Sequence, residues 1–217
     1  MEKYKTISKE GSGEVVEKKS RFLSFLMNVE SEEAAEEFLS RFRKKYYDAR
    51  HVCFAYILKG SPAVMRASDD GEPSGTAGKP LLELLMREGL SDCMIVVVRY
   101  FGGVLLGTGG LLRAYTEAGK AAVAAAECME KIPAVMNFVK LDYTSAGRMP
   151  SILAELDLAA ADIVYSDVCE YTVPVPADKK NIFEKKITEL TNGRVLPEEG
   201  SKCYYAVCGG EVKIFEV

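Results

Sequence analysis

The sequence predicts an α+β protein built from two domains, residues 1–130 and residues 131–217. At 217 residues, 48% of them hydrophobic, the chain can bury a core in one large domain or two small ones. Apolar residues at helical spacing alternate with short apolar runs rich in β-branched residues, which indicates repeated β and α units. Lys131-Ile132-Pro133 indicates the boundary between the domains.

The first domain contains several candidate strands. Residues 4–17 alternate weakly, and Gly11-Ser12-Gly13 is expected to form a turn between two edge strands. Three stronger apolar runs are expected to form strands, the last of them covered on both faces: residues 21–29, 51–58 and 94–98.

Three helices are expected between these strands. Ser31 is a predicted N-cap for a helix over residues 31–46, because Glu32 and Glu33 follow in its first turn. Pro80 is expected where a second helix begins, since proline loses no helical N–H there. An alanine-rich helix is predicted over residues 111–126.

The second domain has an ordered pattern of its own. Its segments read as strand, helix, strand, strand, helix and two closing strands, which is the βαββαβ order of a ferredoxin-like sandwich. The predicted segments are residues 134–143, 146–158, 161–165, 168–175, 179–191, 203–207 and 211–217.

Charge and hydropathy limit the classes of function. The formal charge of −4 argues against a surface coated with nucleic acid, although Arg41-Phe42-Arg43-Lys44-Lys45 forms a local basic run. That run also suits a solvated helix end, where cations meet the negative end of the helix dipole. No apolar run is long enough to span a bilayer, and the charged N-terminus lacks a signal-peptide core. The sequence therefore indicates a cytoplasmic protein without a membrane partner.

The six cysteines are scattered, without a C-x-x-C pair, and no histidine lies near Cys203 and Cys208 to complete a zinc set. They are expected to be small core residues in a reducing compartment. No metal and no cofactor is predicted.

Two glycine-bearing loops organise the first domain: the first loop, residues 68–80, and the second loop, residues 99–110. Gly78-Lys79 suggests a P-loop, but Pro73 and Pro80 occupy positions where that motif needs Gly and Ser or Thr. Gly107-Thr108-Gly109 suggests a dinucleotide fingerprint, but Leu112 replaces its third glycine. Neither nucleotide motif is complete.

Each loop nevertheless leads into a predicted helix N-terminus, where free N–H groups and the macrodipole favour an anion. Arginines beside the loops could hold phosphate or carboxylate. The candidate anion- or nucleic-acid-binding residues are Arg21, Ser74, Gly75, Thr76, Gly78, Lys79, Arg99, Tyr100, Phe101, Gly102, Gly103, Gly107, Thr108, Gly109, Gly110 and Arg113. The alternative is that the glycines only let loops cross above a sheet while Arg99 pairs with a carboxylate of the first loop.

Four further residues are candidates for a supporting role: His51, Asp69, Asp70 and Glu72. The three carboxylates could bind Mg²⁺ or pair with arginines. The tetrapeptide Asp69-Asp70-Gly71-Glu72 is also an ordinary turn composition. His51 and Cys53 share a strand face, but side chains two residues apart lie about 6.5–7 Å from each other, too far for a nucleophile–base pair. A structural histidine is expected, with no catalytic residue.

Several stretches carry a family resemblance: Lys18 to Phe22, Ala49 to Tyr56, Ser68 to Pro80 and Arg99 to Tyr115. On these motifs residues 15–127 resemble the IMPACT/YigZ family, and the order of elements in residues 131–217 agrees with the second domain of its bacterial two-domain members. The resemblance implies that the first domain has the fold of domain IV of elongation factor G, a ribosomal-protein-like βαβ fold with a left-handed crossover. It implies that the ferredoxin-like second domain is similar to domain V of that factor.

The resemblance also implies a function. The eukaryotic IMPACT branch acts in translational control, and the resemblance suggests nucleic-acid or ribosome contact for bacterial members. The preferred hypothesis is a non-enzymatic binding or regulatory protein whose glycine-rich loops contact RNA, the ribosome or a translation-regulatory partner. The alternative is a small-molecule phosphate-binding protein or metal-dependent enzyme that uses Asp69, Asp70 and Glu72. A third hypothesis makes both loops internal scaffolding and places the partner surface in the acidic second domain.

Overall fold

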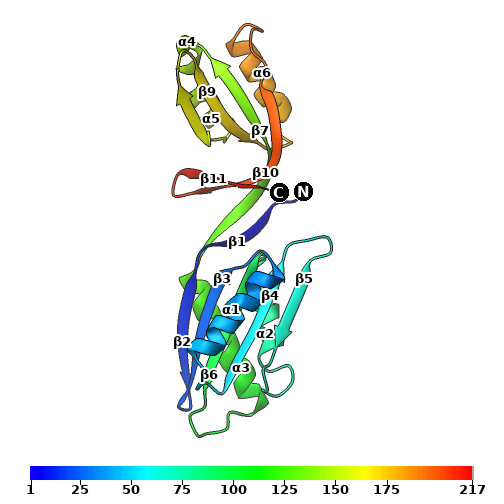
Figure 1. The fold of residues 1–217 in the computed structure, drawn as a ribbon, viewed down its shortest axis with the longest axis vertical. Coiled ribbons are helices and arrows are strands. Elements are labelled where there is room, and N and C mark those ends of the chain that lie inside the picture. The colour runs from blue at the N-terminus through cyan, green and yellow to red at the C-terminus, as the bar shows by residue number, and fades with distance from the viewer. Residues whose placement is uncertain (217) are drawn as a thin grey trace. The chain divides into compact units, whose positions relative to one another are not determined.

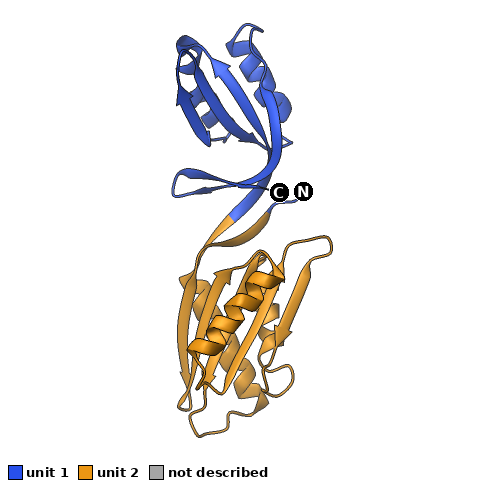
Figure 2. Ribbon diagram, viewed as in Figure 1, with its two compact units in different colours: residues 1–3, 130–217 blue, residues 4–129 orange. Residues whose placement is uncertain are grey.

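The structure, a computed structural model, describes residues 1–216. These residues divide into two compact units, residues 4–129 and residues 1–3 together with 130–216 (Figure 2). No helix among the described residues has the length and apolar character needed to cross a membrane.

The unit of residues 4–129 is built on a five-stranded antiparallel sheet with the order β2-β3-β6-β4-β5 (Figure 1). Its strands are β2 (Gly11–Glu17), β3 (Ser20–Asn28), β4 (His51–Leu58), β5 (Val64–Ser68) and β6 (Cys93–Tyr100). Strand β1 (Tyr4–Lys9) precedes them, and Ser8 Oγ donates a hydrogen bond to the carbonyl of Glu127. The mixed α/β class and the central position of β6 are as expected.

Helices cover both faces of this sheet. Helix α1 (Glu32–Lys45) packs on one face, where Val96 and Val98 of β6 lie. Helices α2 (Gly78–Arg87) and α3 (Gly107–Ala125) pack on the other face with Ile95 and Val97. Because successive strand residues point to opposite faces, an unbroken apolar run in β6 supplies both cores. Ser31 caps α1 as predicted, its Oγ accepting a hydrogen bond from Ala34 N at 3.1 Å.

The turn predicted at Gly11-Ser12-Gly13 is wrong, because both glycines lie inside β2. They let α3 approach the strand: a Cβ on Gly11 would lie 2.1 Å from the carbonyl oxygen of Ala122. This close helix–strand packing, and not a change of chain direction, requires glycine at position 11.

Other boundaries also differ from the predictions. Helix α2 begins at Gly78, two residues before Pro80, and strand β5 was not predicted. Helix α3 begins at Gly107, four residues before Leu111, so Gly107, Gly109 and Gly110 of the second loop lie in its first turn. This shift changes the chemistry of the second loop, because its last residues present helical N–H groups.

The boundary expected near Glu130 falls within strand β7 (Glu127–Leu141), most of which belongs to the other unit. The chain order β7-α4-α5-β8-β9-α6-β10 matches the predicted βαββαβ order, and β11 is added at one edge. The predicted helix over 146–158 is two short helices, and the last residue of the closing strand, 217, lies outside the described residues. The remaining elements are α4 (Tyr143–Ala146), α5 (Met149–Glu155), β8 (Asp162–Tyr165), β9 (Cys169–Val175), α6 (Lys180–Leu190), β10 (Glu198–Cys208) and β11 (Glu211–Glu216).

Candidate functional site

The first loop is closed by its own aspartate. The carboxylate of Asp69 accepts hydrogen bonds from the backbone N–H groups of Gly75 at 2.8 Å, Ala77 at 2.9 Å and Gly78 at 2.8 Å. Burial alone would raise the pKa of Asp69, but these three donors outweigh it and hold the pKa below its ordinary value of 3.8. Asp69 therefore occupies the start of α2 as an anion, from within the chain.

The N–H groups of the first loop that were expected to bind an external anion therefore have internal acceptors in this structure. Thr76 is buried, and both its N–H and its hydroxyl donate to the carbonyl of Pro73. Gly78 packs against the backbone of Ser68, 2.7 Å from where a Cβ would stand. Ser74 and Lys79 are exposed, and Lys79 lies 3.9 Å from Glu83 on its own helix.

Behind the first loop, Glu72 and Arg99 form a buried ion pair. Arg99 Nη1 lies 2.5 Å from Glu72 Oε1, which also accepts a hydrogen bond from the Tyr115 hydroxyl at 2.8 Å. Arg99 is only 5% exposed, and its guanidinium lies over the rings of Phe22 and Phe101, at 5.4 and 5.6 Å from their centroids. Of the two roles considered for Arg99, the structure shows the pairing with a carboxylate of the first loop, Glu72.

His51 joins this network. Its Nδ1 lies 2.7 Å from the carbonyl oxygen of Asp70, and because that oxygen can only accept, Nδ1 carries the hydrogen. Its Nε2 then faces Glu72 Oε1 at 3.8 Å. Cys53 forms hydrogen bonds with the Asp69 carbonyl and the Tyr115 hydroxyl, and burial raises the pKa of its thiol to about 12. A thiol this reluctant to ionise is no nucleophile, and the structural interpretation of His51 agrees with its contacts.

The three carboxylates of the first loop do not converge on one point. Asp69 binds backbone N–H groups, Glu72 binds Arg99 and Tyr115, and Asp70 accepts the N–H of Val52 at 2.7 Å. No group of three or more potential metal ligands occurs among residues 1–216. In this structure the three carboxylates therefore do not form a shared metal site.

The second loop is different, because most of it is open. Gly102 packs against strand β3 and the residue before it. Its N–H donates to Ser20 Oγ at 3.1 Å, and a Cβ there would lie 2.0 Å from the backbone of Lys19. Beyond Gly102 the backbone has positive φ at Gly103 and Gly107. The exposed residues include Phe101, Gly103, Val104, Leu105, Gly107, Thr108, Gly109, Leu112 and Arg113, with Leu105 84% exposed.

A hollow of about 420 Å³ lies beside the second loop. Its polar lining comes from Arg50, His51, Glu72, Arg99 and the first turn of α3. Its apolar lining comes from Pro73, Phe101, Leu105, Leu106 and Leu111. The structure therefore gathers His51, Glu72, Arg99, Phe101, Gly107 and Thr108 from the predicted set around one cavity.

Other predicted residues lie elsewhere. Arg21 is on the exposed part of β3 and pairs with Glu14 at 2.8 Å, and Tyr100 donates a hydrogen bond to Asp48. Neither lines the hollow. The sequence interpretation missed Arg50 and Leu105 as site residues. A signal was present, since Val104-Leu105-Leu106 is an apolar triplet inside a glycine-rich loop.

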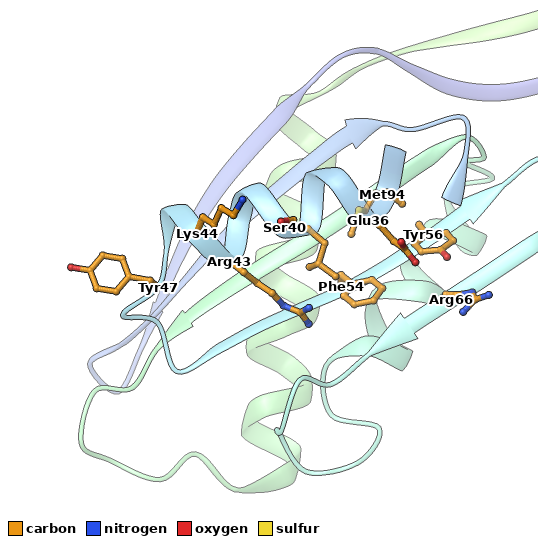
Figure 3. A pocket seen from close by; sticks show the side chains of 11 residues that line it. Glu36, Ser40, Arg43, Lys44, Tyr47, Phe54, Tyr56, Arg66 and Met94 are labelled. Carbon is orange, nitrogen blue, oxygen red and sulfur yellow. The ribbon is translucent and has the colours of Figure 1, made fainter. Parts of the chain in front are cut away.

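A larger hollow, of about 660 Å³, lies between α1 and strands β4 and β5 (Figure 3). The rings of Phe54 and Tyr56 stack at its base with centroids 6.2 Å apart, but Tyr56 is buried and its hydroxyl donates to Glu32. Arg66 pairs with the same Glu32 at 2.8 Å. The base of this groove is occupied by internal contacts, so the open hollow at the second loop is the better candidate site.

Two models of known domain families match separate parts of the chain. The Impact N-terminal domain model matches residues 18–123, and that of a domain of unknown function (DUF1949) matches residues 139–194. The chain is 37% identical to "IMPACT family member YvyE" of Bacillus subtilis over 97% of both chains. It is 36% identical to "IMPACT family member YigZ" of Escherichia coli over 81% of this chain and 87% of the relative.

A crystal structure described as that of a hypothetical protein covers 93% of this chain and 98% of its own, with 32% identity and a TM-score of 0.60. Both sequence relatives are more than 30% identical to this chain over more than two thirds of its length. This protein belongs to the IMPACT family.

Proposed function

We propose that this protein is a cytoplasmic, non-enzymatic binding protein linked to translation, and that it contacts the ribosome through the second loop. Membership of the IMPACT family supports the link, since the resemblance implies translational control in the eukaryotic branch. The first loop has no part in this contact, because Asp69 occupies its N–H groups.

The exposure of the second loop carries the proposal. Leu105 is 84% exposed, and Phe101, Val104 and Leu112 are each more than two-fifths exposed within twelve residues. Exposed apolar residues gathered in this way mark interaction surfaces. A domain whose core is otherwise well packed gains nothing in stability by holding these side chains in water.

Charge around the loop suits a surface made of RNA and protein. Arg113 and Arg50 are exposed, and the first turn of α3 adds the positive end of a helix dipole. Cations and helix N-termini hold nucleic-acid phosphates, while the leucines suit an apolar protein or sugar surface. A ribosomal particle presents both.

Co-sedimentation with ribosomal particles across a salt series tests the proposal. Wild type is expected in the pellet at low salt and increasingly in the supernatant as salt rises, because phosphate contacts release counterions. The double variant Leu105→Ser/Arg113→Ala is expected to stay in the supernatant. Leu196→Ser, at a 71% exposed leucine of the other unit, is the matched control and is expected to pellet like wild type. Pelleting of the double variant at wild-type levels would contradict the proposal.

We also propose that the first domain has the fold of domain IV of elongation factor G and that the second domain resembles domain V. The domain boundary then lies between Glu130 and Lys131. In support, β3 and β4 both pair antiparallel with β6 and are joined through α1, which makes a βαβ crossover like that expected from domain IV of elongation factor G. The order β10-β7-β9-β8 supports the ferredoxin-like likeness to domain V. An experimental structure with a right-handed β3-α1-β4 crossover would contradict the first assignment.

A further inference from the structure

Helices cover the two faces of the five-stranded sheet unequally. Helices α2 and α3 pack on one face, whereas α1 is the only helix among the described residues on the other. A helix about 10 Å wide covers about two strands of a sheet, so α1 leaves part of its face open. Two hollows flank it, of about 660 Å³ toward β4 and β5 and about 500 Å³ toward β2 and β3.

The larger hollow, the α1 groove, lies between Ser40 and Arg43 on α1 and Phe54 and Arg66 on the strands (Figure 3). Its floor is apolar, since Leu39 of α1 is buried there and Phe54 of β4 is half-buried. The Tyr56 hydroxyl at the base already donates to a carboxylate of the chain. The floor therefore needs no polar ligand, and apolar side chains of a partner would remove its exposed part from water.

The charges of the α1 groove are divided along its length. Figure 3 shows Arg43 and Lys44 toward the C-terminal end of α1, and Glu36 and Arg66 toward the other end. The Arg43 side chain is 52% exposed, and its ion pair with Asp70 is long, at 3.4 Å. Lys44 is exposed and pairs with no carboxylate among residues 1–216. One end of the groove thus has a surplus of positive charge in a chain whose formal charge is −4.

An apolar floor beside a cationic end suits a protein segment better than a nucleic acid. Nucleic acids are held mainly through their phosphates, and a row of phosphates along the groove would meet Glu36 as well as the cations. An amphipathic helix instead presents an apolar face with charged residues beside it, and such helices bind in hydrophobic grooves. It would lie beside α1, much as α2 and α3 lie beside each other on the opposite face.

We propose that the α1 groove docks an acidic amphipathic helix of a partner protein. The apolar residues of that helix cover Phe54 and the exposed edge of Leu39, and its carboxylates pair with Arg43 and Lys44. The groove shares no lining residue with the hollow at the second loop. The inference therefore adds a protein partner to the proposed ribosomal contact and does not depend on it.

Ser40 offers a test of the charge. It is exposed, it lines the α1 groove, and it precedes Lys44 by one helical turn. Ser40→Glu places a carboxylate among the cations, where it repels an acidic partner and forms an i,i+4 pair that favours α1. Ser40→Gln has a similar shape without the charge and is the matched control.

A second pair of variants tests the cations themselves. Arg43→Gln/Lys44→Gln removes the surplus charge at one end of the groove. Lys79→Gln/Arg87→Gln makes the same change in net charge at two exposed positions of α2, neither of which lines the groove. Comparison of the two double variants separates a contact in the groove from the effect of overall charge.

The measurement is fluorescence anisotropy of the full chain with a labelled synthetic helix of about four turns, with leucines along one face and glutamates beside them. Wild type, Ser40→Gln and Lys79→Gln/Arg87→Gln are expected to bind this peptide alike. Ser40→Glu and Arg43→Gln/Lys44→Gln are expected to bind it about fivefold or more weakly. The same peptide with glutamine in place of glutamate should bind wild type about fivefold or more weakly. Thermal melts establish that each variant is folded.

Absence of binding by wild type, or equal binding by Ser40→Glu and Ser40→Gln, would overturn the inference. A labelled RNA duplex that binds more tightly than the acidic peptide, and is lost in Ser40→Glu, would make the groove a nucleic-acid surface instead. Sedimentation velocity of the chain alone covers the remaining occupant. A dimer of wild type that Ser40→Glu abolishes would assign the groove to a second copy and also overturn the inference.

Discussion

Asp69 Oδ1 lies 2.8 Å from the backbone nitrogen of Gly78 at the start of α2. The same carboxylate also binds the N–H groups of Gly75 and Ala77. We expect Asp69→Asn to lower the free energy of unfolding by about 2 kcal/mol, because the amide loses the charge and turns a donor toward one of the three N–H groups. Urea denaturation measures this, with Glu83→Gln on the exposed side of α2 as a control expected within about 0.5 kcal/mol of wild type.

The same pair predicts a pH dependence. The folded-state pKa of Asp69 is lowered below 3.8, so the carboxylate contributes stability that is fully present above the unfolded pKa. That contribution is lost as pH falls through the folded pKa. The stability difference between wild type and Asp69→Asn should therefore be constant from pH 7 to about pH 5 and shrink only below pH 4. A difference that already declines between pH 7 and pH 5 would exclude this assignment.

The buried pair of Glu72 and Arg99 predicts unequal effects of two conservative changes. Glu72→Gln leaves the Arg99 guanidinium charged and buried, and should cost about 3–5 kcal/mol of unfolding free energy. Tyr115→Phe removes only a hydroxyl from the same carboxylate and should cost about 1–2 kcal/mol. Equal losses in urea denaturation would mean that Glu72 is not the compensating charge of Arg99.

Two glycines of the second loop should respond to alanine with opposite signs. Gly102→Ala forces a Cβ to 2.0 Å from the Lys19 backbone and should lower the melting temperature severely or prevent folding. Gly109→Ala adds a Cβ into open space within a helix and should stabilise by about 0.5 kcal/mol or more. Thermal melts of the two variants give the comparison. Destabilisation by Gly109→Ala would show that the start of α3 is not helical.

Thiol labelling tests whether Cys53 is buried and hydrogen-bonded beside Asp69 and Tyr115. Cys53 is buried with a pKa of about 12, whereas Cys128 is exposed. Maleimide treatment of the native protein near pH 7.5, followed by peptide mass mapping, should modify Cys128 and leave Cys53 intact until denaturant is added. Rapid native labelling of Cys53 would contradict its hydrogen bonds to Asp69 and Tyr115.

Local signals in the sequence predicted much of the fold. The Ser31 cap, the apolar run of β6 and the β4 strand all follow from residues close together in the chain. The strand β5 was missed because Val64–Ser68 is short and mostly exposed, without the alternation that marks a strand. The glycines of β2 and α3 were misread as turn and loop, because glycine also serves close packing and open helix ends.

The candidate site was predicted in position but not in detail. Sequence placed both loops at helix starts, and it listed the pairing of Arg99 with Glu72 only as one alternative. The two loops differ in whether their backbone N–H groups have an acceptor within the chain, and this difference selects the second loop as the candidate site. Asp69 reaches residues six to nine positions ahead, a contact set by the path of the loop and invisible to any periodicity. The openness of Leu105 likewise depends on tertiary packing.

Hydrogen–deuterium exchange of the full chain, with and without ribosomal particles, is the most direct measurement of which loop faces the partner. We expect slower exchange on binding in peptides that cover residues 101–113 and no change in peptides that cover residues 74–78, whose N–H groups Asp69 and Pro73 already hold. Protection confined to residues 74–78, or to the unit of residues 130–217, would contradict the account.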